Sequence, residues 1–274
     1  GFRTIGAEYQ GTKAPLEEWK PLIWQEIFDY WQSCFDILVQ LVEKESQISE
    51  HTKYVIGHSI RGLVQNGRIE MLDKAIKQVI STKGKFWPSA LESIKNALEY
   101  DTEKMPQVGI NALNSWLELL TPDQTSIEER LKILVVFPTW EHREDSHGQF
   151  VDVAKENAEK FANEISKNIQ SINEHLDLLL TGEQRQTFTF GKALAMKVDC
   201  VDEILQLAIA LLPKFEYPNI NFILGLLAGI YQKSVDCWNK YIDIFTKIPK
   251  LTKFYPEVIC TGIIDTGHLF NLLS

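Results

Sequence analysis

The chain has 274 residues, of which 45% are hydrophobic and 24% are charged, a balance typical of folded domains and unlike that of disordered chains. Its formal charge of −9 argues against binding of nucleic acid through the overall electrostatic field, because phosphate binding depends on clustered lysine and arginine. No uncharged apolar stretch reaches the ~18 residues of a membrane span, so we expect a soluble protein.

The start of the chain and its cysteines predict a cytoplasmic piece of a longer protein. The first residue is Gly1, and the opening segment lacks the basic and apolar regions of a secretory signal. We expect residues 1–20 to be a linker or boundary segment. The cysteines show no CxxC spacing and have apolar neighbours, so we expect reduced, buried thiols at Cys34, Cys200, Cys237 and Cys260.

Helical periodicity, with apolar residues three or four apart, recurs from residue 21 to residue 137. Ser49 is the expected N-cap of the second helix, and Ser126 with Glu129 forms a capping box ahead of the sixth. The β-branched cluster at 133–136 fits either the end of that helix or a short strand, although no second strand is evident for it to pair with. The predicted helices cover residues 21–42, 49–66, 68–79, 88–100, 107–120 and 126–137.

The same patterning continues beyond a polar loop at residues 139–148. The stretch 219–247 is the longest and most apolar helix predicted. Gly225 and Gly229 lie four residues apart within it, a spacing that permits close approach of a neighbouring helix. The predicted helices of this half cover residues 150–166, 171–180, 185–197, 199–212, 219–247, 256–260 and 267–273.

These helices predict the architecture. Short joins require neighbouring helices to run antiparallel, and about a dozen helices in series are more than one compact bundle can bury. We therefore predict an all-α fold of stacked antiparallel hairpins, a degenerate α-solenoid of the HEAT or TPR kind, with a compact two-lobed helical domain as the alternative. The predicted parts are a first set of helical repeats at 21–137, a polar loop at 138–148 and a second set at 149–274.

The loop 138–148 is the strongest chemical candidate, because it gathers imidazole and carboxylate side chains within a few residues. These side chains could hold zinc, manganese or iron in a hydrolase centred on Glu141, His142, Asp145 and His147, although a loop does not fix both imidazoles toward one point. The loop could instead be an exposed polar connection, or a contact surface for a protein partner. The candidate protein-binding residues are Trp140, Glu141, His142, Arg143, Asp145, His147 and Trp87, the last because it lies in a turn where we expect exposure.

No phosphate-binding loop, GxGxxG motif, kinase signature or Cys-His signature is present, so we expect neither a cofactor nor enzymatic activity from this chain.

Four short stretches carry a family resemblance: LESIKNALEYD at 91–101, WLELLTP at 116–122, PTWEH at 138–142 and FVDVA at 150–154. They look like the helical C-terminal arrays of large bacterial anti-phage proteins, namely STAND-type ATPases and sirtuin-type NADases.

The resemblance implies that an effector and a nucleotide-binding module precede Gly1, and that the helical array senses a phage protein and controls oligomerisation or effector release. No binding residue is carried over, since the contact residues of that family vary with the partner. The resulting hypothesis is a non-enzymatic recognition module whose extended surface binds a protein. A metal-dependent hydrolase and a structural self-association scaffold are the alternatives.

Overall fold

The computed structural model describes residues 24–44, 47–121, 126–139, 142–144, 148–198 and 201–273. This part of the chain consists almost entirely of helices, and its only sheet is a two-stranded antiparallel hairpin, so the predicted all-α class is confirmed. None of the helices in these ranges is both long enough and apolar enough to cross a bilayer.

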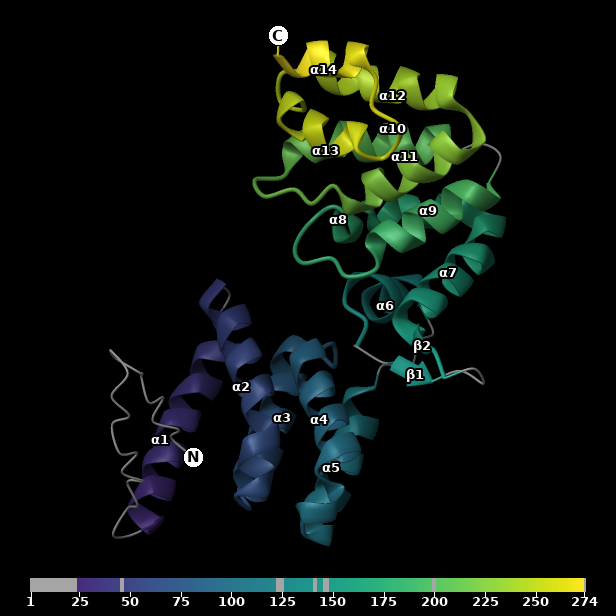
Figure 1. Ribbon diagram of the computed structural model, residues 1–274. Helices are drawn as coiled ribbons and strands as arrows, with labels where there is room; N and C mark the ends of the chain where they lie inside the picture. The colour runs from purple at the N-terminus through teal and green to yellow at the C-terminus, as the bar shows by residue number, and fades with distance from the viewer. Residues whose placement is uncertain are drawn as a thin grey trace, which may run out of the picture.

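The first five helices lie side by side in one lobe (Figure 1). Gly67, after the second helix, and Gly84, at the end of the third, have φ angles of 71° and 79°, a left-handed conformation that glycine adopts with little strain. Pro88 stands at the start of the fourth helix, as predicted. The helices are α1 (Trp24–Val42), α2 (Gln47–Gln65), α3 (Ile69–Lys83), α4 (Pro88–Tyr100) and α5 (Gln107–Leu120), with the 3-10 turn η1 (Thr102–Lys104) between the last two.

Ser49 does not cap α2, so that prediction is wrong. The helix begins at Gln47, and Ser49 lies buried in its first turn. Its hydroxyl donates a hydrogen bond of 2.7 Å to the carbonyl oxygen of Val42 at the end of α1. The last carbonyls of a helix have no hydrogen-bond donor within that helix. Ser49, on the neighbouring helix, supplies a donor for one carbonyl of α1.

The second lobe contains the remaining helices and the hairpin (Figure 1). Ser126 accepts a hydrogen bond of 3.1 Å from the backbone amide of Glu129, which confirms it as an N-cap. The cluster at 133–136 lies in a π-helical turn rather than a strand. The elements are α6 (Ile127–Leu131), η2 (Lys132–Val136), β1 (His142–Glu144), β2 (Phe150–Asp152), α7 (Val153–Ile165), η3 (Ser166–His175), α8 (Leu176–Leu179), α9 (Thr187–Lys197), α10 (Asp202–Leu211), η4 (Leu212–Lys214), α11 (Asn221–Lys233), α12 (Val235–Lys247), η5 (Thr252–Phe254), α13 (Tyr255–Ile259) and α14 (Thr266–Leu273).

The single long helix predicted for 219–247 is two helices, α11 and α12. The helix is interrupted at Ser234, whose backbone is extended (φ −158°, ψ 112°). The hydroxyl of Ser234 accepts a hydrogen bond of 3.3 Å from the amide of Cys237. Serine hydroxyls favour such caps over helix interiors, because they compete for backbone hydrogen bonds. The apolar periodicity continues across the break, and therefore the sequence pattern alone did not reveal it.

The prediction that the cysteines are buried is also wrong. Cys237 and Cys260 are exposed and Cys34 is half-buried, while Cys200 lies outside the described residues. In α12 the apolar neighbours of Cys237 face the core, and the thiol lies at the edge of that face, where it is exposed. Those buried neighbours are Trp238, Tyr241, Ile242 and Phe245.

The described residues bury two separate hydrophobic clusters. The first runs from Phe35 to Leu120 and the second from Leu131 to Ile259, and they correspond to the two lobes of Figure 1. The change from one cluster to the other thus falls between Leu120 and Leu131, ahead of the polar loop at 138–148. Helix α6 and the turn η2 pack with the second lobe.

Close helix packing sits at the centre of the second lobe, as the Gly225 and Gly229 spacing predicted. A Cβ atom at Gly225 would overlap the carbonyl oxygen of Phe188, and one at Gly229 would lie 2.6 Å from the Cβ of Ala195. On the facing helix, a Cβ at Gly191 would lie 2.6 Å from the carbonyl oxygen of Phe222. Glycine therefore lets the backbones of α9 and α11 approach each other closely.

Candidate functional site

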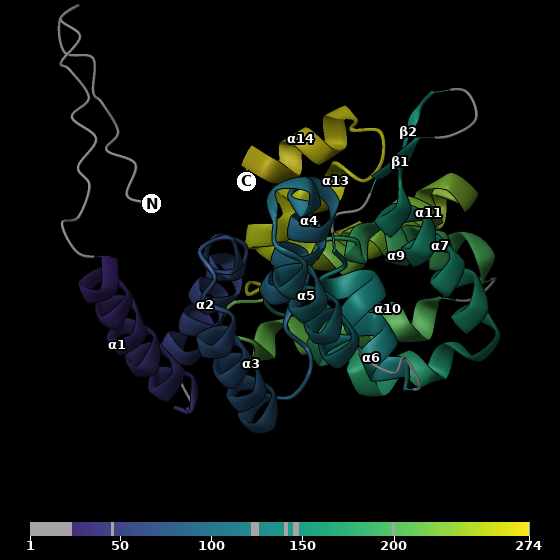
Figure 2. The same ribbon diagram turned by 90° about the horizontal axis from the view of Figure 1, so that it is seen from below.

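The loop that the sequence marks as a candidate site contains a short hairpin. Strand β1 pairs antiparallel with β2, with Arg143 opposite Val151 and Glu144 opposite Phe150. Gly148, which precedes β2, has a φ of 76°, so it provides the left-handed residue needed near the turn. The hairpin projects from the second lobe (Figure 2), and Phe150 on it is 81% exposed. An aromatic side chain that is this exposed on a projecting hairpin is available for contact.

Three polar contacts fasten the hairpin to the rest of the second lobe. The guanidinium of Arg143 forms an ion pair with Glu156 of α7, with Nη2 3.0 Å from Oε2. Asp152 accepts a hydrogen bond of 3.0 Å from the amide of Lys155, which caps α7, and another of 3.3 Å from the side-chain amide of Gln186. The hairpin is therefore tied to α7 and to the residue just before α9.

The structure describes only part of the predicted site. Arg143 is exposed but is held by Glu156, and His142 contributes its backbone to β1. Trp140, Glu141, Asp145 and His147 lie outside the described residues. A partner-contact role for these residues therefore remains a prediction.

Trp87 is buried, so its predicted exposure is wrong. Only 1% of its surface is accessible, and its indole nitrogen donates a hydrogen bond of 2.9 Å to the backbone carbonyl of Lys53. Trp87 immediately precedes α4, and its ring packs against α2 in the first hydrophobic cluster. A tryptophan whose N–H finds a partner is a stable core residue even when its backbone lies in a turn.

An open groove of about 510 Å³ lies beside the hairpin, along α7 and α9. Asp152 lines the groove, and because side chains two apart in a strand point to the same face, Phe150 lies on that face of the hairpin as well. The groove carries two lysines, Lys155 and Lys192, and two acidic residues, Asp152 and Glu159. Its lining residues are Asp152, Lys155, Glu159, Gln186, Phe188, Thr189, Lys192, Ala193 and Met196.

Helix α9 presents one face to the core and another to this groove. Phe190 is fully buried and stacks on Phe161 and Phe222, with ring centroids 5.7 and 6.1 Å apart. Phe188 lies two residues earlier, a rotation of about 200° around an α-helix, and is 41% exposed. Met196, at eight residues from Phe188, is 42% exposed on the same side.

A second open groove of about 500 Å³ continues on the other side of α9. It shares Phe188 and Lys192 with the first groove, and it extends to Ile263 beyond α13. Phe188 and Lys192 thus form the ridge between two hollows. We call Phe150 of the hairpin, together with Phe188, Lys192 and Met196 of α9, the hairpin-groove surface.

The sequence pattern did not single out the residues on α9. The sequence TFTFGKALAMK places Phe188 and Phe190 close together, and both look like core residues to a pattern of apolar spacing. The available signal was that α9 is apolar on more than one face, which in a surface helix leaves some large side chains uncovered.

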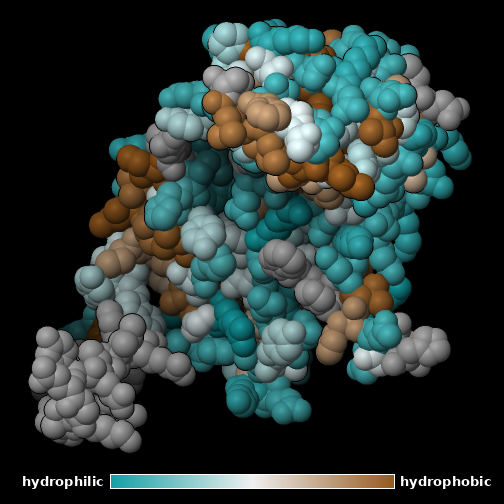
Figure 3. All heavy atoms as spheres, turned by 45° about the horizontal axis from the view of Figure 1, so that its top comes forward, coloured by the Kyte–Doolittle hydropathy of each residue, from teal (hydrophilic) through white to brown (hydrophobic). Residues whose placement is uncertain are grey.

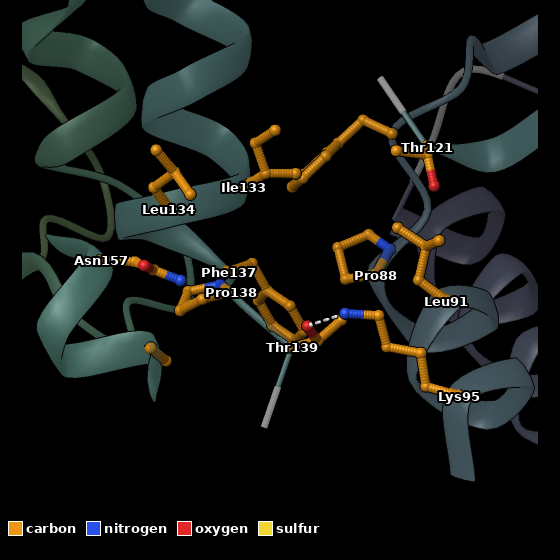
Figure 4. A pocket seen from close by; sticks show the side chains of 12 residues that line it. Pro88, Leu91, Lys95, Thr121, Ile133, Leu134, Phe137, Pro138, Thr139 and Asn157 are labelled. Atoms are coloured by element: carbon orange, nitrogen blue, oxygen red, sulfur yellow. Dashed lines mark hydrogen bonds between the residues drawn. The ribbon is translucent and has the colours of Figure 1, made fainter. Parts of the chain in front are cut away.

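A third hollow of about 240 Å³ lies between the two lobes (Figure 4). Pro88, Leu91 and Lys95 of α4 line one side, and Phe137 with the residues of η2 lines the other. The ammonium of Lys95 donates a hydrogen bond of 2.9 Å to the hydroxyl of Thr139, which crosses the gap. This hollow is small for a ligand site, since small-molecule pockets usually hold about 300 to 1,000 Å³.

Arg185 contacts both sides of this junction between the two lobes. Its guanidinium lies 3.7 Å from the ring centroid of Phe137, donates a hydrogen bond of 3.1 Å to the carbonyl of Pro138, and forms an ion pair of 3.3 Å with Glu92 of α4. Both charged side chains are largely buried, so solvent screens the pair only weakly. The junction therefore serves to hold the two lobes together.

The described ranges contain no group of three or more His, Cys, Asp and Glu side chains placed to hold a metal ion.

Comparison of the chain with protein-family models, with curated protein sequences and with solved structures found no match.

Proposed function

We propose that this chain is a non-enzymatic protein-recognition module and that the hairpin-groove surface binds its partner. The single observation that carries the proposal is the grouping of large exposed apolar side chains, Phe150, Phe188 and Met196, around hollows that also carry charge. Aromatic and methionine side chains are enriched in protein interfaces, and apolar anchors surrounded by polar residues supply most of the binding energy.

The charge on the ridge between the hollows indicates the kind of partner that we expect. Lys192 stands on the ridge between the two hollows, whereas Lys155 shares the first hollow with the acidic residues Asp152 and Glu159. A partner segment with one or two apolar side chains next to a carboxylate would satisfy both features. We expect a short helix or extended segment of a protein, docked by its side chains along α9.

The scaffold suits this role. We propose that the antiparallel helices form a degenerate α-solenoid in two blocks, since repeat arrays offer long surfaces whose residues are fixed by neighbouring helices. By the family resemblance, the partner is a phage protein, the setting is the bacterial cytoplasm, and the module acts as a sensor within a longer defence protein.

Selection from a displayed library of phage-protein peptides tests the proposal. Peptides that bind the wild-type chain are expected to lose at least ~10-fold in affinity to a variant with Phe188→Ser and Met196→Ser, because apolar anchors dominate such interfaces. The matched control is Tyr217→Ser, since Tyr217 is 74% exposed and lies outside both grooves. Equal binding by the double variant, or an equal loss in the control, would contradict the assignment.

A further inference from the structure

Helix α14 turns its polar side toward the protein and its apolar side toward solvent. His268 is the only buried residue of this helix within the described chain. Phe270 and Leu273 are 73% and 87% exposed, and Leu269 and Leu272 are exposed as well. A surface helix of a monomer normally has the reverse arrangement, with its apolar stripe on the core.

Specific contacts fix this orientation. Asp265 and His268 cap each other: the His268 amide donates to the Asp265 carboxylate at 3.0 Å, and the Asp265 amide donates to Nδ1 of His268 at 3.1 Å. The ring of His268 packs edge-on against Trp238, with centroids 5.3 Å apart. The side-chain amide of Asn271 points toward the hydroxyl of Tyr255, at 3.4 Å. Rotation of α14 to bury its leucines would break the contacts with Trp238 and Tyr255.

The exposed apolar side chains extend into the preceding turn, which adds Ile263 and Ile264. Figure 3 shows hydrophobic atoms gathered on the second lobe, in the region of α13 and α14. If each full side chain offers roughly 200 Å², the six together expose on the order of 700 Å². The largest apolar patch of a typical monomer is about 300–600 Å², and one partner of a standard interface buries about 800 Å².

The charge of the chain indicates what covers this patch. Between residues 258 and 273 there is no Lys, Arg or Glu, and Asp265 is the only Asp, whereas the whole chain has a formal charge of −9. Two copies of the chain repel each other over most of their surface and least where charge is absent. In a two-fold contact, the apolar patch of one copy packs on the same patch of the other copy, so no complementary charge is needed. We infer that two copies of this chain dimerise through the apolar face of α14.

Sedimentation equilibrium of the purified 274-residue chain tests this inference, over concentrations from about 1 to 100 μM. We expect a monomer–dimer equilibrium, and we expect Phe270→Glu to raise its dissociation constant at least ~30-fold, since the change places a charge in both halves of the contact. The matched control is Val108→Glu on α5, because Val108 is 61% exposed and lies in the other lobe. It should leave the equilibrium unchanged.

Other outcomes overturn the dimer. A wild-type chain that stays monomeric at the highest concentration would mean that another molecule or a further segment covers the patch. An oligomer that grows beyond two copies, or one that both variants weaken equally, would also contradict the two-fold contact. Circular dichroism establishes that each variant is folded, and binding of peptides to the hairpin-groove surface is a separate measurement, so the two proposals fail independently.

Discussion

Lys53 illustrates a cost that a single residue imposes on the fold. Its side chain is only 11% exposed, and the carboxylate of Glu50, with which it pairs, lies 3.9 Å away and is exposed. Burial lowers the pKa of Lys53, and the positive charges of Lys83 and Lys132 lower it further, while Glu50 partly opposes them. A charge buried with so weak a partner destabilises the folded state.

We therefore expect Lys53→Met to raise the free energy of unfolding by about 1 kcal/mol at pH 7, because methionine keeps the aliphatic packing and removes the charge. For a base whose pKa is lowered by folding, the cost is fully present below the folded-state pKa. It disappears as the pH rises through that pKa toward the unfolded value of about 10.4. Urea unfolding of both proteins between pH 7 and pH ~10 checks this. A difference that stays constant with pH would contradict the charge explanation.

Trp87 and Phe188 show why exposure cannot be predicted from sequence at this scale. Trp87 lies in a turn yet is buried, because its indole finds the carbonyl of Lys53 on a helix that is distant in sequence. Phe188 lies two residues from the buried Phe190 yet is exposed, because no element covers its side of α9. In both cases the deciding neighbour belongs to another segment of the chain.

At the scale of helices, the contact between α9 and α11 depends on the absence of side chains. Gly225→Ala would place a methyl group on the carbonyl oxygen of Phe188, which is backbone and cannot move aside cheaply. We expect this change to lower the free energy of unfolding by about 3 kcal/mol, as overpacking does in a tight core. Thermal or urea unfolding measures the loss.

Gly62→Ala is the matched control for that variant. Gly62 is also within a helix, α2, but a Cβ there would meet nothing within 4 Å. Alanine stabilises a helix interior over glycine, so we expect Gly62→Ala to raise the free energy of unfolding by about 0.5–1 kcal/mol. A loss at Gly62 as large as that at Gly225 would show that helix packing is not the cause.

Helix boundaries with a signal in the residues at the boundary were predicted, and boundaries that depend on other features were missed. Glycine and proline marked the ends of α2 and α3 and the start of α4, because they act through their own backbone. The break at Ser234 and the start of α7 at Val153 were missed. The first is hidden by continuous apolar spacing, and the second depends on pairing of β2 with β1.

At the scale of the whole molecule, Arg185 joins the lobes. We expect Arg185→Ala to lower the free energy of unfolding by about 2 kcal/mol, since it removes a largely buried ion pair and leaves Glu92 without this partner. Hydrogen exchange at residues 133–139 should become at least ~10-fold faster, because this segment loses the guanidinium that packs on it.

Arg130→Ala controls for the loss of an arginine. Arg130 lies 4.3 Å from the ring centroid of Phe161 and pairs with Glu164, so all of these contacts stay within the second lobe. We expect exchange in α4 to be unaffected by this change and faster in Arg185→Ala. Equal effects of the two variants on α4 would show that Arg185 does not couple the lobes.

Periodicity and composition by themselves determined that this protein is helical, where most of its helices lie, and that α11 meets a neighbour through glycines, because each of these signals is carried by residues close together in the chain. The assignment of buried and exposed faces was decided only by tertiary structure. The groove beside Phe188, the junction at Arg185 and the outward apolar face of α14 all arise from contacts between segments far apart in sequence. Local spacing can show that a helix has an apolar side, but what covers that side depends on the rest of the fold.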